Sequence, residues 1–338
     1  MAPQADEPRV LMLTPDEVLD PAYEPLSAKL AAHQLIKPER SRAGVLGELS
    51  AADYVVGDWT QELHLDAEEL DAAARCLAVF QPNAGTDMVD IEHAAELGIP
   101  VANAPGQNAR AVAEWVVMAI LATLKDVVRN HLGVLAGRWD MVQAGRLGVH
   151  ELGDRTVGII GMGRIGQDVA ARLAPFELGR LVYSDVAAPP VEVERRLGLE
   201  HLEIDEVCAV SDVLSLHAPL LPATRGMLDA RRIALMPKGA VVVNAARGGL
   251  IDEPALCEAL AAGHLKAAAL DVFVEEPLPS DSPLRKLPNV LLSPHLAGST
   301  NEARERMMTN ALRNLDGVLR GGDPEHVVNG VGGVPRRG

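Results

Sequence analysis

Aromatic side chains are scarce in this chain of 338 residues, which holds three Trp, three Tyr and three Phe. Only 3% of the residues are aromatic, whereas 48% are hydrophobic, so any core must be packed with aliphatic side chains. A chain of this length is expected to form about two domains. The composition therefore predicts two aliphatic cores rather than a small or disordered protein.

Cysteine is equally rare. The three residues, Cys76, Cys208 and Cys257, are isolated and have none of the paired spacings that mark a disulfide framework or a thiolate metal site. We therefore predict no metal site and a reducing, cytoplasmic location.

The chain also has fewer basic than acidic residues and no long apolar run. The 31 Lys and Arg against 47 Asp and Glu give a net charge of −16, which argues against nucleic acid or an anionic membrane as a partner. The N-terminus lacks the basic and then apolar pattern of a signal peptide. The longest apolar region, from Ala111 to Leu124, contains Glu114 and is too short to span a bilayer, so it predicts a buried helix.

The most informative stretch runs from Thr156 to Asp185. A short apolar run predicts a buried strand, and Gly161, Gly163 and Gly166 follow in the spacing G-x-G-x-x-G. Helical periodicity comes next, and then a second strand that ends on an acid. This order of strand, glycine turn, helix, strand and acid is typical of a dinucleotide-binding unit.

Each part of this unit has a physical role. Glycines allow a tight turn and a close approach to a pyrophosphate, and the helix N-terminus presents free N–H groups to it. Asp185 would accept hydrogen bonds from a ribose 2′-OH and repel a 2′-phosphate, which favours NAD over NADP. The alternative is a glycine turn followed by a solvated aspartate, with strand, helix and acid in register by chance.

The remaining pattern alternates strands and helices. Strands are expected at residues 9–14, 53–56, 76–80 and 99–102, and, beyond a hinge at 103–106, at 213–217, 240–244, 266–272 and 290–292. This predicts two parallel α/β sheets. We also expect one helix from about 109 to 130, a loop at 133–153, a helix at about 299–319, a frayed segment at 1–8 and a loose tail after Gly321.

Three polar side chains follow predicted strands of the second sheet, where ligands of parallel sheets bind. Arg247, in a glycine-flanked turn, can hold a carboxylate with two parallel hydrogen bonds. His295 is suited to move the proton of a secondary alcohol near neutral pH. Glu276 beside the imidazole would orient the ring and favour its protonated form. Taken singly, each could instead be a structural or surface residue.

Several long segments, in order, resemble the D-isomer-specific 2-hydroxyacid dehydrogenases. They are GMGRIG, SLHAPLLPATRGMLD, MPKGAVVVNAARGGLID, AALDVFVEEP and LLSPHLAGST. The family includes phosphoglycerate, glyoxylate/hydroxypyruvate and D-lactate dehydrogenases. The resemblance implies an NAD-dependent oxidoreductase of a small 2-hydroxy or 2-oxo acid, in which Arg247 holds the substrate carboxylate, His295 is the acid and base, and Glu276 is its partner.

The resemblance also implies a domain order and binding residues. A Rossmann NAD-binding domain, residues 105–296, is inserted into a smaller flavodoxin-like substrate domain, residues 1–104 and 297–338. The helix that begins near Asn108 builds a homodimer. Asp271 would hold the nicotinamide carboxamide. The full set expected to bind the cofactor is Gly161, Gly163, Arg164, Ile165, Gly166, Asp185, His217, Ala245, Asp271 and His295.

The substrate loop is expected at residues 83–87, where the backbone N–H groups of Ala84 and Gly85 would bind the substrate anion. Asn83 departs from the small or apolar residue usual in the family, and its amide could reach the substrate. Phosphoglycerate dehydrogenases carry arginines shortly before Thr60, where this chain has Gly57-Asp58-Trp59. A phosphate beside Asp58 would be repelled, so we expect an unphosphorylated substrate, with Trp59 in contact with it.

Two alternatives remain open at this point. One is a relative that oxidises another small anion, as phosphite and formate dehydrogenases do, although formate dehydrogenases usually pair the histidine with Gln rather than Glu. The other is a non-catalytic NAD(H)-sensing protein similar to the C-terminal-binding corepressors, which share these motifs.

Overall fold

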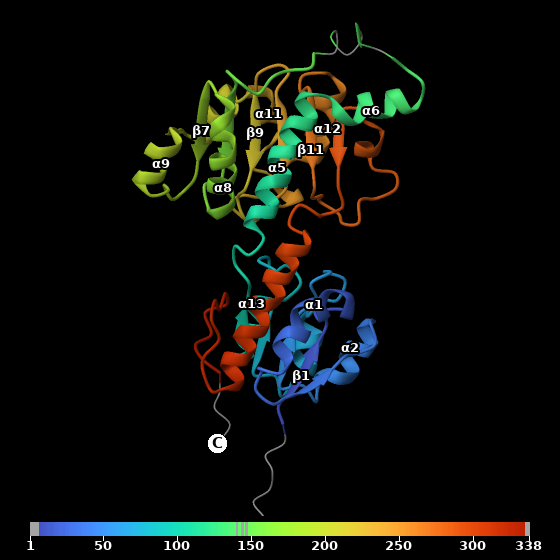
Figure 1. Ribbon diagram of the computed structural model, residues 1–338, viewed down its shortest axis with the longest axis vertical. Coiled ribbons are helices and arrows are strands. Elements are labelled where there is room, and N and C mark those ends of the chain that lie inside the picture. The colour runs from blue at the N-terminus through green and yellow to red at the C-terminus, as the bar shows by residue number, and fades with distance from the viewer. Residues whose placement is uncertain (1–6, 140, 143–144, 146–147, 335–338) are drawn as a thin grey trace, which may run out of the picture. The chain divides into compact units, whose positions relative to one another are not determined.

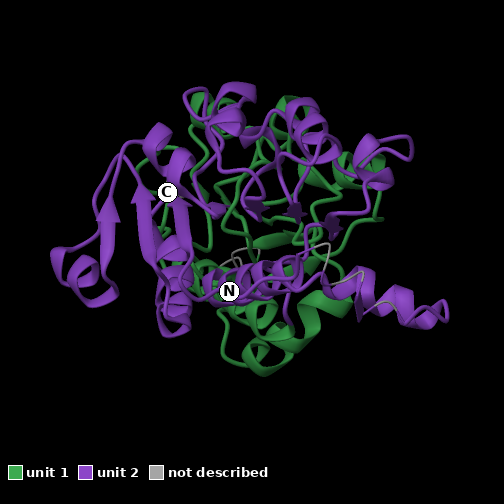
Figure 2. Ribbon diagram, turned by 90° about the horizontal axis from the view of Figure 1, so that it is seen from above, with its two compact units in different colours: residues 1–108, 301–338 green, residues 109–300 purple. Residues whose placement is uncertain are grey.

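A computed structural model describes residues 7–139, 141–142, 145 and 148–334, and the segment expected to fray, 1–8, lies largely outside this range (Figure 1). The chain forms two compact units (Figure 2). Unit 1 comprises Met1–Asn108 and Asn301–Gly338, and unit 2 is Ala109–Thr300. Among the described residues, no helix is both long enough and apolar enough to cross a membrane.

Unit 1 is a parallel five-stranded sheet in the order β2-β1-β3-β4-β5. Helices α1 and α13 pack on one face, and α2, α3 and α4 on the other. The strands are β1 (Arg9–Met12), β2 (Gln34–Ile36), β3 (Tyr54–Val56), β4 (Ala78–Phe80) and β5 (Val101–Ala102), and the helices are α1 (Asp16–Ser27), α2 (Arg42–Leu49), α3 (Ala67–Ala72), α4 (Ile91–Glu96) and α13 (Asn301–Leu319).

The tail after α13 is not loose, and the prediction for it was wrong. Val327 forms an antiparallel bridge with Ala102, and the Val328 N–H donates to the Val101 carbonyl at 2.9 Å. The Asn329 side chain accepts from the Val101 N–H at 3.1 Å. The tail thus covers the open edge of β5, an exposed edge being a site where sheets pair wrongly.

Unit 2 is a parallel seven-stranded sheet in the order β12-β11-β10-β9-β6-β7-β8. Its strands are β6 (Thr156–Ile160), β7 (Arg180–Ser184), β8 (Leu199–His201), β9 (Val213–Leu216), β10 (Val241–Asn244), β11 (Ala267–Leu270) and β12 (Val290–Leu292). Its helices are α5 (Ala109–Leu124), α6 (Val127–Leu135), α8 (Arg164–Leu173), α9 (Val191–Leu197), α10 (Ile204–Val210), α11 (Ala230–Leu235) and α12 (Glu253–Ala261), with short 3₁₀ turns η1 (Ala174–Phe176), η2 (Gly248–Leu250) and η3 (Pro283–Lys286).

The two strand orders confirm the predicted fold class. Unit 1 has the flavodoxin-like order, and β8-β7-β6-β9-β10-β11 of unit 2 is the Rossmann order with β12 added at the edge. In unit 2 the chain winds in opposite directions from β6, so the carboxyl ends of β6 and β9 form the switch point at which such sheets bind ligands.

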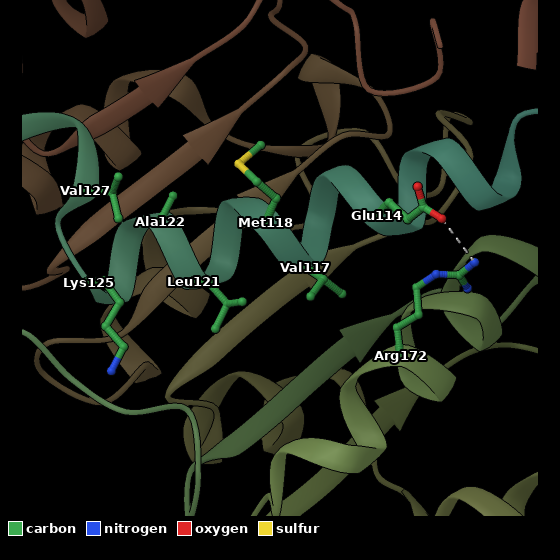
Figure 3. A pocket seen from close by; sticks show the side chains of 8 residues that line it. All are labelled: Glu114, Val117, Met118, Leu121, Ala122, Lys125, Val127 and Arg172. Atoms are coloured by element: carbon green, nitrogen blue, oxygen red, sulfur yellow. Dashed lines mark ion pairs between the residues drawn. The ribbon is translucent and has the colours of Figure 1, made fainter. Parts of the chain in front are cut away.

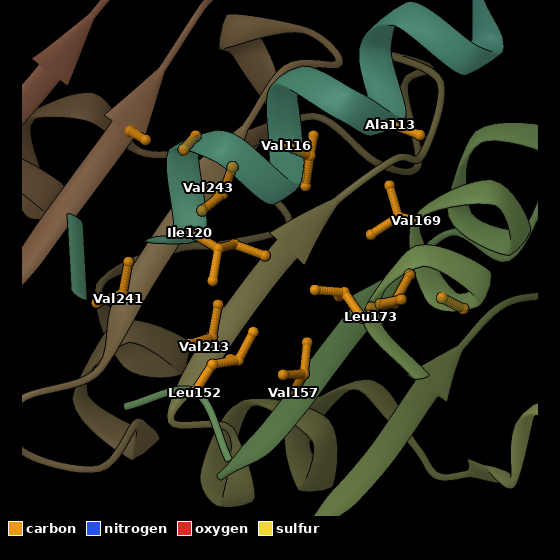
Figure 4. Close-up of a cluster of buried hydrophobic side chains, with 14 of the residues drawn as sticks. Ala113, Val116, Ile120, Leu152, Val157, Val169, Leu173, Val213, Val241 and Val243 are labelled. Carbon is orange, nitrogen blue, oxygen red and sulfur yellow. The ribbon is translucent and has the colours of Figure 1, made fainter. Parts of the chain in front are cut away.

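The core of unit 2 is aliphatic, as the composition predicts. On one face of the sheet, Val116 and Ile120 of α5 and Leu173 of α8 pack over Val157 of β6 and Val213 of β9, and all five are fully buried (Figure 4). Helices α10, α11 and α12 cover the other face with the same kind of side chain.

The single helix expected from 109 to 130 is broken. Helix α5 ends at Leu124, and Asp126 adopts a left-handed backbone with φ of 54° before α6 begins at Val127. Aspartate tolerates this conformation better than most residues, which permits the break. Helix α6 then extends to Leu135, into the region expected to be a loop, and parts of 133–153 lie outside the described residues.

Two glycines at the start of α8 form a matched pair of variants that tests how closely this helix packs on the turn after β6. A Cβ on Gly166 would lie 2.2 Å from the Gly161 carbonyl oxygen, whereas one on Gly163 would meet nothing within 4 Å. We expect Gly166→Ala to reduce the free energy of unfolding by about 1–3 kcal/mol, and Gly163→Ala to change it by less than about 1 kcal/mol. Urea denaturation measures both. Equal stability of the two variants would contradict the packing described.

Candidate active site

The turn between β6 and α8 lies at the switch point. Gly161 has φ of +96°, and a Cβ there would lie 2.6 Å from the Ala218 nitrogen, so only glycine fits. Gly163 is the N-cap of α8, and the space beside it is open. Arg164 and Ile165 form the first turn of the helix, whose N–H groups and positive dipole end suit a phosphate.

Asp185 follows β7, next to this turn. Its carboxylate accepts from the Met162 N–H at 2.5 Å and from the Ala187 N–H at 3.0 Å. The two bonds fix the acid beside the glycines, as the sequence predicts for a residue that selects a ribose. An open helix N-terminus with an acid beside it fits a dinucleotide without a 2′-phosphate.

His217 and Ala245 follow β9 and β10 at the same edge of the sheet. The His217 Nε2 lies 2.9 Å from the Ser215 hydroxyl, and burial lowers the pKa of His217 to about 4. The ring is therefore uncharged near neutral pH. It presents a neutral group, rather than a cation, at the switch point.

Arg247 lies in the turn between β10 and η2, and neighbouring side chains hold this turn. The Asn244 amide donates to the Arg247 carbonyl at 2.9 Å and its oxygen accepts from the Ala246 N–H at 3.0 Å. A Cβ on Gly248 would lie 1.9 Å from the Phe273 carbonyl carbon, so this turn packs directly on the one that leads to Glu276. The sequence analysis did not identify Asn244, although an asparagine at a strand end typically bonds nearby backbone.

Glu276 and His295 form a pair at 2.8 Å between Oε2 and Nδ1. Burial raises the pKa of the Glu276 carboxyl, but the hydrogen bonds from His295 and the Phe273 N–H, with the charges of His295 and Arg247, outweigh it and hold the pKa below its usual range. An ionised carboxylate only accepts hydrogen bonds, so Nδ1 carries a proton and Nε2 is left to exchange one. The predicted partners are thus brought together.

Asp271 has a different setting from the one expected. It is 1% exposed, and its carboxylate accepts from the Ser293 hydroxyl, the Leu296 N–H at 2.8 Å and the Ala297 N–H at 2.7 Å. Its carbonyl accepts from the His295 N–H at 2.8 Å. Asp271 therefore folds the loop that presents the histidine. Its expected contact with a nicotinamide stays a prediction.

The His295 backbone needs this support. Its φ is +54°, a left-handed conformation that costs a residue with a side chain about 1–3 kcal/mol. Hydrogen bonds to a buried carboxylate on both sides of the residue stabilise that conformation. Ser293, the third residue of the loop that bonds to Asp271, has no distinguishing signal in the sequence.

Four of the expected substrate residues, Trp59, Asn83, Ala84 and Gly85, belong to unit 1 and follow β3 and β4, whereas the fifth, Arg247, belongs to unit 2. The Asn83 amide donates to the Trp59 carbonyl at 3.3 Å, which joins the two loops. This amide is thus directed at backbone. Among the described residues, the N–H groups of Ala84 and Gly85 donate no hydrogen bond, as an anion-binding loop requires.

The argument from Asp58 was wrong. Its side chain is fully buried rather than turned toward a ligand, and it accepts from Arg40 at 3.0 Å, the Thr60 hydroxyl at 2.7 Å and the Leu63 N–H at 3.1 Å. Asp58 is a structural acid that folds its loop, and its charge is balanced by Arg40. The other part of the argument for an unphosphorylated substrate, the absence of arginine at 57–59, is unaffected.

Comparison with known proteins gives the same picture. Residues 117–297 match the family model described as D-isomer specific 2-hydroxyacid dehydrogenase, NAD binding domain. The chain is 41% identical over 261 residues to the D-3-phosphoglycerate dehydrogenase of Methanocaldococcus jannaschii, covering 77% of this chain and 49% of that protein. It is 38% identical over 273 residues to the glyoxylate reductase of Thermofilum pendens, with 78% of each covered.

The chain spans about half the length of the phosphoglycerate dehydrogenases it matches. A solved structure from Thermus thermophilus superimposes with a TM-score of 0.81 at 34% identity, covering 95% of this chain and 99% of that one. With the glycine turn and the paired Glu276 and His295 at one sheet edge, these matches lead to one conclusion. The chain belongs to the D-isomer-specific 2-hydroxyacid dehydrogenase family and carries its NAD-binding domain.

Proposed function

We propose that this protein is an NAD-dependent dehydrogenase that transfers a hydride between the nicotinamide and a small, unphosphorylated 2-hydroxy or 2-oxo acid. One observation carries the proposal: Arg247 and the ion-paired Glu276 and His295 follow strands at the same sheet edge as the open glycine turn. A carboxylate-binding cation and a proton donor beside a dinucleotide site are what reduction of a 2-oxo acid requires.

The residues divide the work as follows. When bound, NADH supplies the hydride. Arg247 holds the substrate carboxylate, and His295 donates a proton from Nε2 to the carbonyl oxygen as it becomes a hydroxyl. Glu276, held by the Phe273 N–H at 2.9 Å, keeps Nδ1 protonated and stabilises the imidazolium before transfer. In the reverse direction the neutral imidazole accepts the hydroxyl proton.

We assign unit 1 as the substrate domain and unit 2 as the cofactor domain. The N–H groups of Ala84 and Gly85, which lack partners in the described chain, suit the substrate anion. The loop at 57–59 offers no arginine for a phosphate, and Arg40 nearby is committed to Asp58 and Glu62. This supports an unphosphorylated substrate.

The alternative activities have less support. A formate dehydrogenase of Granulicella is 30% identical to this chain with a TM-score of 0.82, but the carboxylate at Glu276 argues against that chemistry here. The corepressors share the motifs that carry His295 and Glu276, so what favours the dehydrogenase is the 2.8 Å contact of the two side chains, which suits proton transfer.

We also propose that the protein is a cytoplasmic homodimer. Helices α5 and α6 leave apolar side chains exposed, including Met118 at 45%, Leu132 at 55% and Leu135 at 71%. A shallow apolar groove with charged ends runs along α5 (Figure 3); its lining is Glu114, Val117, Met118, Leu121, Ala122, Lys125, Val127 and Arg172. Soluble monomers rarely expose so continuous an apolar surface, and pairing about a two-fold axis would bury it.

Substitution of Arg247 and substitution of His295 should impair catalysis in different ways. Arg247→Ala removes carboxylate anchoring, so it should raise KM for the oxo acid and also lower kcat. His295→Ala removes proton transfer and should lower kcat about 10² to 10⁴-fold with little change in KM. Initial rates with NADH and a panel of 2-oxo acids measure both. Wild-type turnover by His295→Ala would refute the mechanism.

Glu276→Gln should shift the pH profile in a defined direction. The low pKa of Glu276 keeps it ionised at neutral pH, where its charge favours the imidazolium. Reduction needs His295 protonated and is lost as pH rises. Glutamine carries no charge and loses this interaction with the protonated ring, so the alkaline limb of kcat/KM for reduction should move to lower pH. An unmoved limb would show that the two side chains are uncoupled.

The dimer predicts a mass near 72 kDa, twice the 35.9 kDa of the chain, in light scattering at micromolar concentration. Leu132→Lys, on the exposed face of α6, should shift the mass toward the monomer. Val191→Lys, at a residue of α9 that is 58% exposed, is the matched control and should leave the mass unchanged. A stable wild-type mass near 36 kDa would disprove this assembly.

A further inference from the structure

The turn between β6 and α8 presents a backbone N–H group that the described chain does not use. The Gly163 N–H donates no hydrogen bond within the described residues, and the space beside this glycine is open. It precedes the N–H groups of Arg164 and Ile165, which are free as in the first turn of any helix. These neighbouring donors can meet the pyrophosphate of the dinucleotide only if the peptide before Gly163 is correctly oriented.

Met162, which forms that peptide, is held from two sides. The residue is 2% exposed, and its N–H donates to the Asp185 carboxylate at 2.5 Å. Its carbonyl accepts from Gln167 Nε2 at 3.0 Å, and no other hydrogen bond to this carbonyl is present in the described part of the chain. A buried carbonyl needs a donor, so the Gln167 amide determines the direction in which this one points.

The planarity of the peptide carries this effect to the next residue. The Met162–Gly163 bond is trans, and in a planar trans peptide the carbonyl and the N–H point in opposite directions. Because the carbonyl is directed at the side chain of Gln167, the Gly163 N–H is directed away from it. The hydrogen bond on one side of the peptide thus fixes the free donor on the other.

Gln167 is well placed for this role. Side chains of a helix lean toward its N-terminus, so an amide in the first turn of α8 reaches back over the glycine turn. The Gln167 backbone N–H also donates to the Gly163 carbonyl at 3.0 Å. One residue therefore holds the carbonyls on both sides of the Gly163 N–H, the first through its side chain and the second through its backbone.

We infer that Gln167 is a positioning residue for the pyrophosphate of the cofactor, and that its amide keeps the Gly163 N–H directed at the phosphate. Without the amide, the Met162 carbonyl is free to turn toward another donor. Glycine at position 163 permits that rotation, and the N–H then leaves the ligand. The inference concerns the NAD-binding domain alone and requires neither Arg247 nor His295.

Two ligands separate this role from a merely structural one. ADP-ribose contains the pyrophosphate, whereas adenosine contains no phosphate. Gln167→Leu removes the donor and keeps a good helix former, so it should raise the Kd for ADP-ribose about 3- to 10-fold and leave that for adenosine within about twofold. Gln167→Glu keeps the shape but offers no donor when ionised, and should weaken ADP-ribose at least as much. Displacement of NADH, followed by its fluorescence, gives both constants.

Asp168→Asn is the matched control on α8. Its carboxylate lies 3.7 Å from Arg172 and its side chain is 40% exposed, so this variant should leave both constants within about twofold. Equal weakening of ADP-ribose and adenosine by Gln167→Leu would mean general damage to the domain and would overturn the inference. An unchanged Kd for ADP-ribose would overturn it as well. The constants are measured without turnover, so they are independent of the proposed reaction.

Discussion

The carboxylate of Asp271 is the interaction on which the candidate active site depends. It is buried at the end of β11 and bonds the Ser293 hydroxyl and the N–H groups of Leu296 and Ala297, on both sides of His295. These bonds offset the left-handed backbone of the histidine and direct its ring to Glu276. Burial of the Asp271 charge is unfavourable by itself, but the hydrogen bonds that the carboxylate accepts offset this cost. All of them come from the loop that carries His295.

The same principle governs the other end of the sheet. Asp185 accepts a hydrogen bond from the backbone of the glycine turn, and Asn244 donates one to the backbone of the Arg247 turn. Each of these two candidate loops is thus fixed by a polar side chain at a strand end. Because the strands are parallel, these loops share one edge, and the aliphatic core beneath makes that edge rigid. In unit 1, Asp58 folds its loop in the same way, through the Thr60 hydroxyl and the Leu63 N–H.

The sequence predicts what is local. The glycine spacing, the apolar strands and the residues that follow them identified the fold class and brought out Arg247, Glu276 and His295, because these signals lie within a few residues. What it did not predict depends on distant contacts. The tail lies on β5 through backbone hydrogen bonds and the side chain of Asn329, more than 200 residues away along the chain, and no local pattern marks this contact. The burial of Asp58 depends on Arg40, 18 residues away, and the break at Asp126 replaces one helix by two without a Gly or Pro to mark it.

Hydrogen exchange of the Leu296 and Ala297 amides in Asp271→Asn tests the central claim most directly. Loss of the carboxylate removes hydrogen bonds to a charged group, each worth about 1.5–3 kcal/mol, so both amides should exchange about 10 to 100 times faster than in the wild type. Amides of β10, such as that of Val242, should keep their protection. Unchanged exchange at Leu296 and Ala297 would show that Asp271 does not hold the histidine loop.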